Sequence, residues 1–347
     1  MRSLVVLPLA ALCLLVLAAR ASAAPPEAHV SLEVLTQPGL PLTASQTWYQ
    51  VLTDAGISGL RLRSGGSRDK PSVTRQGTAA KPSYHVVGIL SSDNVLQLPG
   101  GRFKTTDRAK LRQWLDRLRD GGAEGVTHER SAFGLLPSEL QEVTDDLKRP
   151  VLSSTQDAAA ASVVRQIAGT LGYPLQADAA AGRALKDIRI EDELRGMSAG
   201  TALAAVLRPA GLGLVPERPG RGTLQYRIAK VGRGTTAWPV GWEPRQPTTK
   251  LLPKLYEFLN VEITGIPVSE ALTAVAARIE APMLFDRNAM ALHGVDPSQV
   301  PAELPSKRIS YSQTLRRLLA AAKLRYEVRV DEAERPFMWV TTVKPVR

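Results

Sequence analysis

The sequence predicts an α+β fold made of three small domains, the last two of which are copies of one unit. Three observations lead to this prediction. One apolar pattern recurs along the chain at offsets of 112 and 108 residues. Helical and strand periodicities follow each other in both copies. Two stretches rich in glycine, serine and proline interrupt the periodic segments, as is typical of loops and linkers.

Residues 1–24 have the features of a secretory signal peptide. Arg2 gives a positive start, residues 4–19 are apolar, and Ala21-Ser22-Ala23 forms a small-residue cleavage site. We expect cleavage near Ala23 and a mature protein in the periplasm or cell envelope. An uncleaved anchor is less favoured, because this apolar run contains Pro8 and is shorter than the roughly 20 residues of a spanning helix. We expect no membrane span after cleavage.

The composition limits the chemistry of the mature chain. Cys13 is the only cysteine and lies within the signal, so neither disulfides nor a thiolate metal site is expected, and the cores must be stable without them. Removing Arg2 and Arg20 leaves 42 basic against 33 acidic residues, a net charge of +9. Lysine and arginine are interleaved with acidic residues, so we expect solvated charged faces and no nucleic-acid partner.

We expect the N-terminal domain to span residues 27–150. Thr43 and Gln46 have the spacing of a capping box for a first helix, which Gly56 would close. Strands are predicted at 59–63, 84–90 and 94–98, and the stretch 64–83 is predicted to be a long loop. A short helix should follow at 137–147. Apolar positions at helical spacing mark two longer helices: Trp48, Val51, Leu52 and Ala55 in the first, and Leu111, Trp114, Leu115 and Leu118 in the second.

The internal repeat covers residues 151–231 and 251–347. The segment MSAGTALAAVLRPAGLGLVPE from Met197 aligns without a gap with ISYSQTLRRLLAAAKLRYEVR from Ile309, at an offset of 112. Upstream, the offset is 108, and Asp178 aligns there with Asp286. Repeated units of this size point to one supersecondary structure used twice.

Each unit should place two helices on one face of a small sheet. In the second copy, Pro267 is expected to lie in the first turn of a helix, and a short strand is expected at 282–285. Ser310 and Gln313 form a capping box for the next helix. The residues of 324–330 alternate between apolar and charged, which predicts a half-buried strand that returns through 337–343. The core positions are Val268, Ala271, Leu272, Val275 and Ile279 in one helix, Leu315, Leu318, Leu319 and Ala322 in the other, and Leu224, Tyr226 and Ile228 in the return strand of the first copy.

Residues 232–250 are predicted to be a linker between the two units, because they are rich in proline and glycine. Trp238 and Trp242 lie within this stretch. We expect both side chains to pack against a neighbouring domain, with an exposed ligand-binding role as the less favoured alternative.

These residues resemble the small periplasmic N-domains of secretins and the short N-terminal module of TonB-dependent receptors. The shared features are a helix start like VSEAL, an apolar strand that ends at an aspartate, and SYSQTLRRLL leading into KLRYEVRV. The resemblance implies docking to other proteins or to copies of the same chain. The printed sequence ends at Arg347, shortly after the second unit, so we do not expect the pore or transport functions of those families.

The whole chain also resembles a group of exported proteins of planctomycete-type bacteria. The phrases LPKLYEFLNVEITGIPVSEAL, FGLLPSELQEVTDDLKRPV and VDEAERPFMWVTT carry this likeness. It implies no particular activity.

No catalytic, cofactor-binding or metal-binding residues are predicted. The four histidines, His29, His85, His128 and His293, are scattered, and we expect structural roles for them. No phosphate loop or serine-hydrolase motif is present. Carboxylates cluster in two places, which could serve glycoside hydrolysis but are expected to form exposed ion pairs: Asp187, Glu191, Asp192 and Glu193, then Asp331, Glu332 and Glu334.

Three functions are therefore compatible with the sequence. The favoured one is a non-catalytic envelope protein that binds a protein partner or itself, by strand addition at a sheet edge. The second is a binder of anionic wall or surface polymer, using basic residues with Trp114, Trp238 or Trp242. The third is an enzyme whose site forms between domains.

Overall fold

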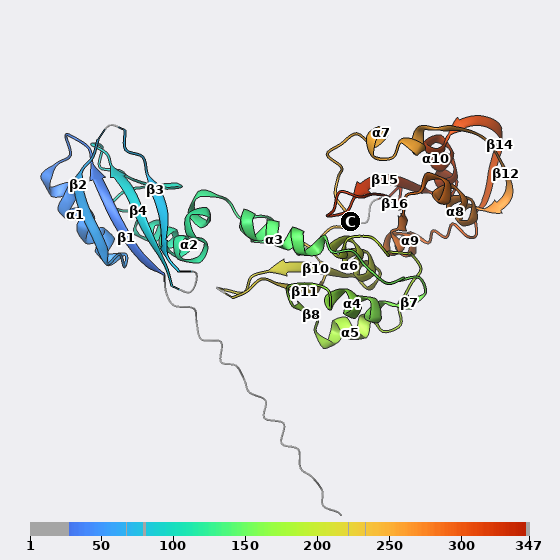
Figure 1. Cartoon of the computed structure of the whole chain (residues 1–347), viewed down its shortest axis with the longest axis horizontal. Coiled ribbons are helices and arrows are strands. Elements are labelled where there is room, and N and C mark those ends of the chain that lie inside the picture. The colour runs from blue at the N-terminus through green and yellow to red at the C-terminus, as the bar shows by residue number, and fades with distance from the viewer. Residues whose placement is uncertain (1–27, 67, 79–80, 221, 233, 345–347) are drawn as a thin grey trace, which may run out of the picture.

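The computed structural model describes residues 28–344 except 67, 79–80, 221 and 233, and this part of the chain has the predicted α+β class (Figure 1). The predicted signal peptide and its cleavage site lie outside the described residues. Figure 1 shows a sheet domain at one end of the molecule, followed by α3 (Pro137–Leu147) and then by the two C-terminal units.

The N-terminal domain is a six-stranded sheet that buries two helices. The strand order is β2-β1-β4-β5-β6, with β3 paired to β4, and β1 is parallel to both β2 and β4. The apolar stripes predicted for the two helices are confirmed, since they lie in one core with alternate residues of β1 and β4. The bounds are β1 (His29–Thr36), α1 (Leu42–Asp54), β2 (Gly59–Ser64), β3 (Ser72–Gly77), β4 (Pro82–Leu90), β5 (Leu96–Leu98), β6 (Gly101–Phe103) and α2 (Arg108–Thr127).

Two predictions for this domain are wrong. The stretch 64–83 contains β3, which pairs antiparallel with β4, for example Val73 with Val86. Its side chains are mostly polar and exposed, so the sequence lacks the alternation that marks a strand. The capping box of Thr43 and Gln46 is not formed, because α1 begins two residues earlier than that box requires and its N-cap, Pro41, has no side-chain hydrogen bond.

Helix α3 has the predicted bounds but belongs to the core of the unit that follows it. Leu135, Val143 and Leu147 pack in the same cluster as α4 and α6 of the first unit. Asp146, which is buried, accepts hydrogen bonds from the Gly172 amide at 2.7 Å and from the Tyr226 hydroxyl at 2.9 Å. The N-terminal core therefore ends near α2, earlier than the predicted boundary at residue 150.

The two C-terminal units contain the same succession of elements with the same pairing. In each, a three-stranded sheet has a central strand that is parallel to one neighbour and antiparallel to the other, and a separate antiparallel pair lies beside it. The first unit contains β7 (Ala158–Ala159), α4 (Ala160–Ala168), β8 (Leu175–Gln176), α5 (Ala179–Leu185), β9 (Arg189–Ile190), α6 (Ala199–Leu207), η1 (Arg208–Ala210), β10 (Leu212–Glu217) and β11 (Gln225–Lys230).

The second unit is longer in its paired strands. It follows a short connection, α7 (Thr248–Leu251) and η2 (Pro253–Tyr256). Its elements are β12 (Phe258–Pro267), α8 (Val268–Ile279), β13 (Met283–Phe285), α9 (Arg287–His293), β14 (Pro301–Ser310), α10 (Tyr311–Ala321), β15 (Leu324–Val330) and β16 (Pro336–Thr342). The core positions predicted for α8 and α10 are buried, which confirms those two stripes.

The sequence analysis missed one short helix in each unit, α5 and α9. These helices begin after the aligned residues Asp178 and Asp286. Each aspartate side chain accepts a hydrogen bond from an amide three residues later, Ala181 in α5 and Ala289 in α9. An aspartate N-cap satisfies an amide that a helix start leaves unpaired. Pro267 also differs from the prediction, since it is the N-cap of α8 rather than part of its first turn.

The predicted capping box at α10 is confirmed. Ser310 Oγ accepts from the Gln313 amide, and the Gln313 side chain accepts from the Ser310 amide. We expect Ser310→Ala to lower the free energy of unfolding by about 1 kcal/mol, as is usual for a lost N-cap. Urea unfolding measures this change. Ser306→Ala, at an exposed position of β14, is the matched control and should change stability by less than about 0.5 kcal/mol.

Candidate functional site: the contact between the C-terminal units

In the three-stranded sheet of the second unit, the central strand β16 is buried on both of its faces. Met338 and Val340 of β16 pack with α8 and α10 of their own unit, whereas Phe337 and Trp339 lie in the core cluster of the first unit. Successive residues of a strand point to opposite faces, so one strand serves two cores. The first unit therefore covers the outer face of this sheet.

The linker predicted at 232–250 takes part in this contact. Trp238 is buried in the first unit's core, which confirms that it packs against a domain. Trp242 is 37% exposed but lies edge-on to Trp238, with ring centroids 5.1 Å apart. The Trp242 backbone forms a reciprocal bridge with Val330 of β15. Hence the middle of this stretch is a packed connection and not a free linker.

The hairpin between β15 and β16 caps helix α6 of the first unit. The Ser198 amide donates to Asp331 Oδ2 at 2.9 Å, and the Thr201 amide donates to Glu332 Oε2 at 3.1 Å. Ser198 itself makes no side-chain capping bond. In the aligned helix α10, the equivalent bonds come from Ser310 and Gln313 of the same unit. The first unit thus relies on the second for contacts that the second makes for itself.

Both hairpin carboxylates are buried, although the sequence analysis predicted exposed ion pairs at this cluster. Asp331 is 2% exposed and Glu332 is 5% exposed, whereas Glu334 is exposed as predicted. Arg335 Nε donates to Asp331 Oδ2 at 3.0 Å, and Trp238 Nε1 donates to Glu332 Oε1 at 2.5 Å. The prediction is wrong for Asp331 and Glu332 because tertiary packing, which the local pattern does not show, covers the turn.

Burial raises the pKa of Glu332 above its ordinary value, and the bonds from Trp238 and Thr201 oppose this rise. A side chain at Gly200 would not fit beside the carboxylate, since an added Cβ would lie 2.5 Å from Glu332 Oε1. A glycine at this position therefore lets the hairpin approach the helix.

A second set of contacts joins the end of α6 to the start of α9. Arg208 Nε and Nη2 donate to the two oxygens of Asp286, both at 2.8 Å. Asp286 is 2% exposed and also accepts from the Ala289 amide and the Thr341 hydroxyl. Paired bonds of this kind fix the orientation of both groups.

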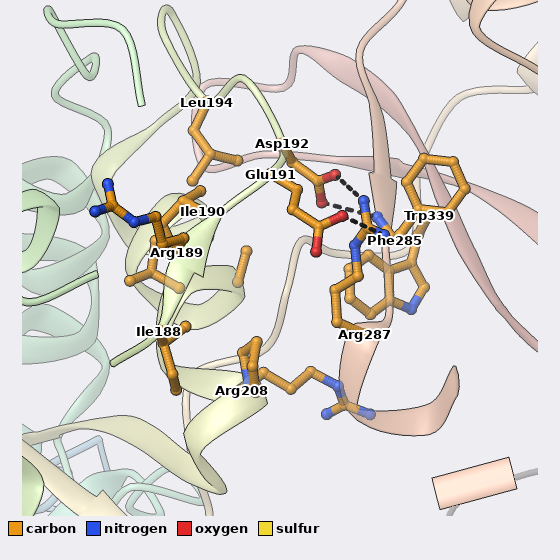
Figure 2. Close-up of a pocket in the computed structure, with 13 residues that line it drawn as sticks. Ile188, Arg189, Ile190, Glu191, Asp192, Leu194, Arg208, Phe285, Arg287 and Trp339 are labelled. Atoms are coloured by element: carbon orange, nitrogen blue, oxygen red, sulfur yellow. Dashed lines mark hydrogen bonds and ion pairs between the residues drawn. The ribbon is translucent and has the colours of Figure 1, made fainter. Parts of the chain in front are cut away.

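Arg287, next to Asp286, binds the first unit's acidic loop. Its Nη2 lies 3.0 Å from Asp192 Oδ1 and its Nη1 lies 2.8 Å from Glu191 Oε2, as Figure 2 shows. The Phe285 amide donates to Asp192 Oδ2 at 3.1 Å. Burial raises the pKa of Asp192 above its ordinary value, and the opposing effect of the Arg287 charge is smaller. The predicted exposed ion pairs are therefore wrong for Asp192, while Asp187, Glu191 and Glu193 are exposed.

A cavity of about 180 Å³ lies between these contacts (Figure 2). Its apolar lining includes Ile190, Val206, Phe285 and Trp339, and Arg208 and Arg287 lie at its border. Both guanidinium groups are paired with the carboxylates described above. The arrangement thus holds the two units together, while Arg189, which also lines the cavity, donates to the Asp157 carbonyl at 2.8 Å.

In the N-terminal domain, His85 of β4 belongs to a polar cluster with side chains of β1. His85 Nδ1 lies 3.2 Å from Ser31 Oγ, and His85 Nε2 lies 3.4 Å from Glu33 Oε2. The other oxygen of Glu33, Oε1, pairs with Arg63. Within the described residues, no three His, Cys, Asp or Glu side chains are placed to hold a metal ion.

Sequence reasoning missed Arg208, Asp286 and Glu332 as members of one contact. One signal was available: the return strand reads PFMWVTT in the second copy but QYRIAK in the first. A continuous apolar run indicates a strand that is buried on both faces, whereas alternation indicates one open face. This difference marks the outer face of the second sheet as covered.

Three comparisons with known proteins, against family models, curated sequences and solved structures, found no match to this chain. Among the helices that the structure describes, none has both the length and the apolar character needed to cross a bilayer.

Proposed function

We propose that this protein is a non-catalytic, exported envelope protein whose C-terminal units bind another protein or a second copy of the chain through a sheet edge. The observation that carries the proposal is the locked contact between the units. Buried, fully bonded carboxylates hold the units in one arrangement, so their free edges are presented rigidly. A preorganised surface loses little entropy on binding, which favours a docking role.

Backbone edges are the surfaces that this block offers. Among the strands that the structure describes, β12 and β14 pair only with each other, and β15 is the edge of its sheet. The amides and carbonyls of an edge strand bind an extended segment without needing special side chains. The sequence resemblance to secretin N-domains implies the same docking role.

The test is cross-linking in the source cells. The envelope fraction of cells that export the tagged protein by its own leader is washed in low salt or in about 0.5 M salt, and each washed fraction is then cross-linked and purified. We expect one or a few protein partners, or a cross-linked dimer, in amounts that change less than about twofold between the washes, because backbone pairing is weakly screened. Recovery in the cytoplasm would contradict the proposal.

The same experiment separates the polymer alternative. A binder of anionic wall polymer would release its ligand as the salt rises, since exposed charge pairs are screened beyond roughly 10 Å at 0.1 M. Polysaccharide recovered at low salt, with no protein partner, would favour that function instead.

A further inference from the structure

We infer that the outer edge of β15 binds an extended, acidic peptide segment of another protein, which adds as an antiparallel strand. This inference rests on the proposed function and specifies its site and the chemistry of its partner. Three observations carry it: the direction of the backbone groups, the blocked edge of the first unit, and the groove beside β15.

The bridge to Trp242 fixes which residues of β15 face outward. The Val330 amide donates to the Trp242 carbonyl at 3.0 Å, and the Trp242 amide donates to the Val330 carbonyl at 2.8 Å. In an antiparallel ladder, alternate residues direct both backbone groups to the same side. Tyr326 and Val328 therefore also direct theirs away from β16. These outward groups have no partner in the part of the chain that the structure describes.

The equivalent edge of the first unit is already occupied. At the offset of 112, Tyr326 aligns with Leu214 and Val328 aligns with Pro216. The Leu214 carbonyl accepts from the Trp238 amide at 2.7 Å. Pro216 has no amide to donate, and proline is a usual means of blocking an edge strand. The edge of β10 is thus closed by the segment that carries Trp238 and by Pro216. The edge of β15 leaves the backbone groups of Tyr326 and Val328 open to a partner.

A groove of about 450 Å³ runs beside this open edge. Thr248 and Tyr256, whose hydroxyls lie 2.5 Å apart, form the wall opposite β15. Arg316 of α10 and Arg325 of β15 also line the groove. Arg325 pairs with Glu327, but Arg316 makes no ion pair with any residue that the structure describes.

Charge and shape select the occupant. The unpaired guanidinium of Arg316 favours a carboxylate on the incoming strand. Tyr256 and Tyr326 offer aromatic surface to an apolar side chain at an alternate position. The residues opposite β15, Thr248 and Tyr256, limit the width of the groove. In the first unit, the equivalent edge binds one extended segment, the one that carries Trp238. An acidic strand with one aromatic residue meets these conditions.

The test uses a synthetic probe and one pair of variants. The probe is a fluorescent heptapeptide that alternates valine and glutamate around one tryptophan, and a second peptide has lysine in place of glutamate. Val328→Pro removes the outward amide, and the aligned Pro216 shows that this strand position accepts proline. Val328→Thr keeps the amide and the branched shape and is the matched control. Thermal unfolding confirms that both variants are folded.

In fluorescence anisotropy with the full chain, we expect the acidic peptide to bind at least about tenfold more tightly than the lysine peptide. Val328→Pro should weaken the acidic peptide about tenfold, because it removes a hydrogen bond and the local strand geometry. Val328→Thr should stay within about twofold. Arg316→Glu should remove the preference for the acidic peptide.

Three outcomes overturn the inference: no binding of the acidic peptide to the wild type, equal binding to Val328→Pro, or a dimer that Val328→Pro abolishes, which would make a second copy the occupant. Cross-linking of the Val328→Pro variant in cells distinguishes failure of the β15 inference from failure of the proposed protein-binding function. If the envelope partner is still captured, binding occurs elsewhere and only the β15 inference fails. If the wild type captures no partner at all, the proposed function fails.

Discussion

Replacing Arg208 with alanine should lower the free energy of unfolding of the C-terminal units by about 3 kcal/mol. The substitution leaves the Asp286 carboxylate, which is 2% exposed, without its paired donors. Removing one partner of a buried ion pair typically costs about 3–5 kcal/mol, and the partial exposure of Arg208 places the expected effect at the low end. Urea unfolding followed by tryptophan fluorescence measures the change.

The double variant Arg208→Met with Asp286→Leu is the informative control. It removes both charges together, so we expect it to recover most of the lost stability, since replacing a buried pair by apolar groups is often close to neutral. Arg183→Ala, at an exposed position of α5, should change stability by less than about 0.5 kcal/mol. A loss below about 1 kcal/mol for Arg208→Ala would show that this pair does not hold the units together.

Replacing Glu332 with alanine should lower the free energy of unfolding by about 2–3 kcal/mol. The change leaves the Trp238 indole N–H and the Thr201 amide without their acceptor, and a buried unpaired donor costs about 1–3 kcal/mol. Hydrogen exchange of the α6 amides should accelerate, with Thr201 among them. Glu334→Ala, in the same turn but exposed, is the matched control and should leave these amides protected.

The raised pKa of Glu332 gives this contact a pH dependence of known sign. A carboxyl whose folded pKa lies above its ordinary value of 4.5 contributes most to stability when it is protonated, below that value. Its contribution falls as the pH rises from 4.5 through the folded pKa, and is constant above it. Glu332→Gln cannot titrate, so the stability of the wild type relative to this variant should decrease over that range. A difference that increases with pH would contradict the assigned direction.

Much of the fold follows from local patterns in the sequence. Val268 to Ile279 and Leu315 to Ala322 have helical spacing, and 324–330 alternates, so these elements are fixed by burial on one side. Ser310 and Gln313 are three residues apart and need only each other to cap α10. Strand β3 was missed because its side chains are almost all exposed and polar, so they show no alternation between apolar and polar residues.

The contact between the units was not predictable in this way. Asp331, Glu332 and Asp192 look like solvated charges, since their neighbours in the sequence are polar and turn-forming. Although Asp331 also pairs with the nearby Arg335, each of the three accepts a backbone hydrogen bond from an amide more than 90 residues away along the chain. A short segment has the same composition whether or not a distant surface covers it, so burial of a turn has no local signature.

The sequence by itself determined the two long helices of the second unit, the strand and return strand that follow them, and the offsets that relate the two units, because each depends on neighbours a few residues apart. Tertiary structure decided which unit supplies the cap of α6, which carboxylates are buried, and which sheet edge remains open. These features depend on side chains that distant segments bring together. The plainest case is Asp331, in the hairpin of the second unit, which accepts a hydrogen bond from the Ser198 amide at the start of α6.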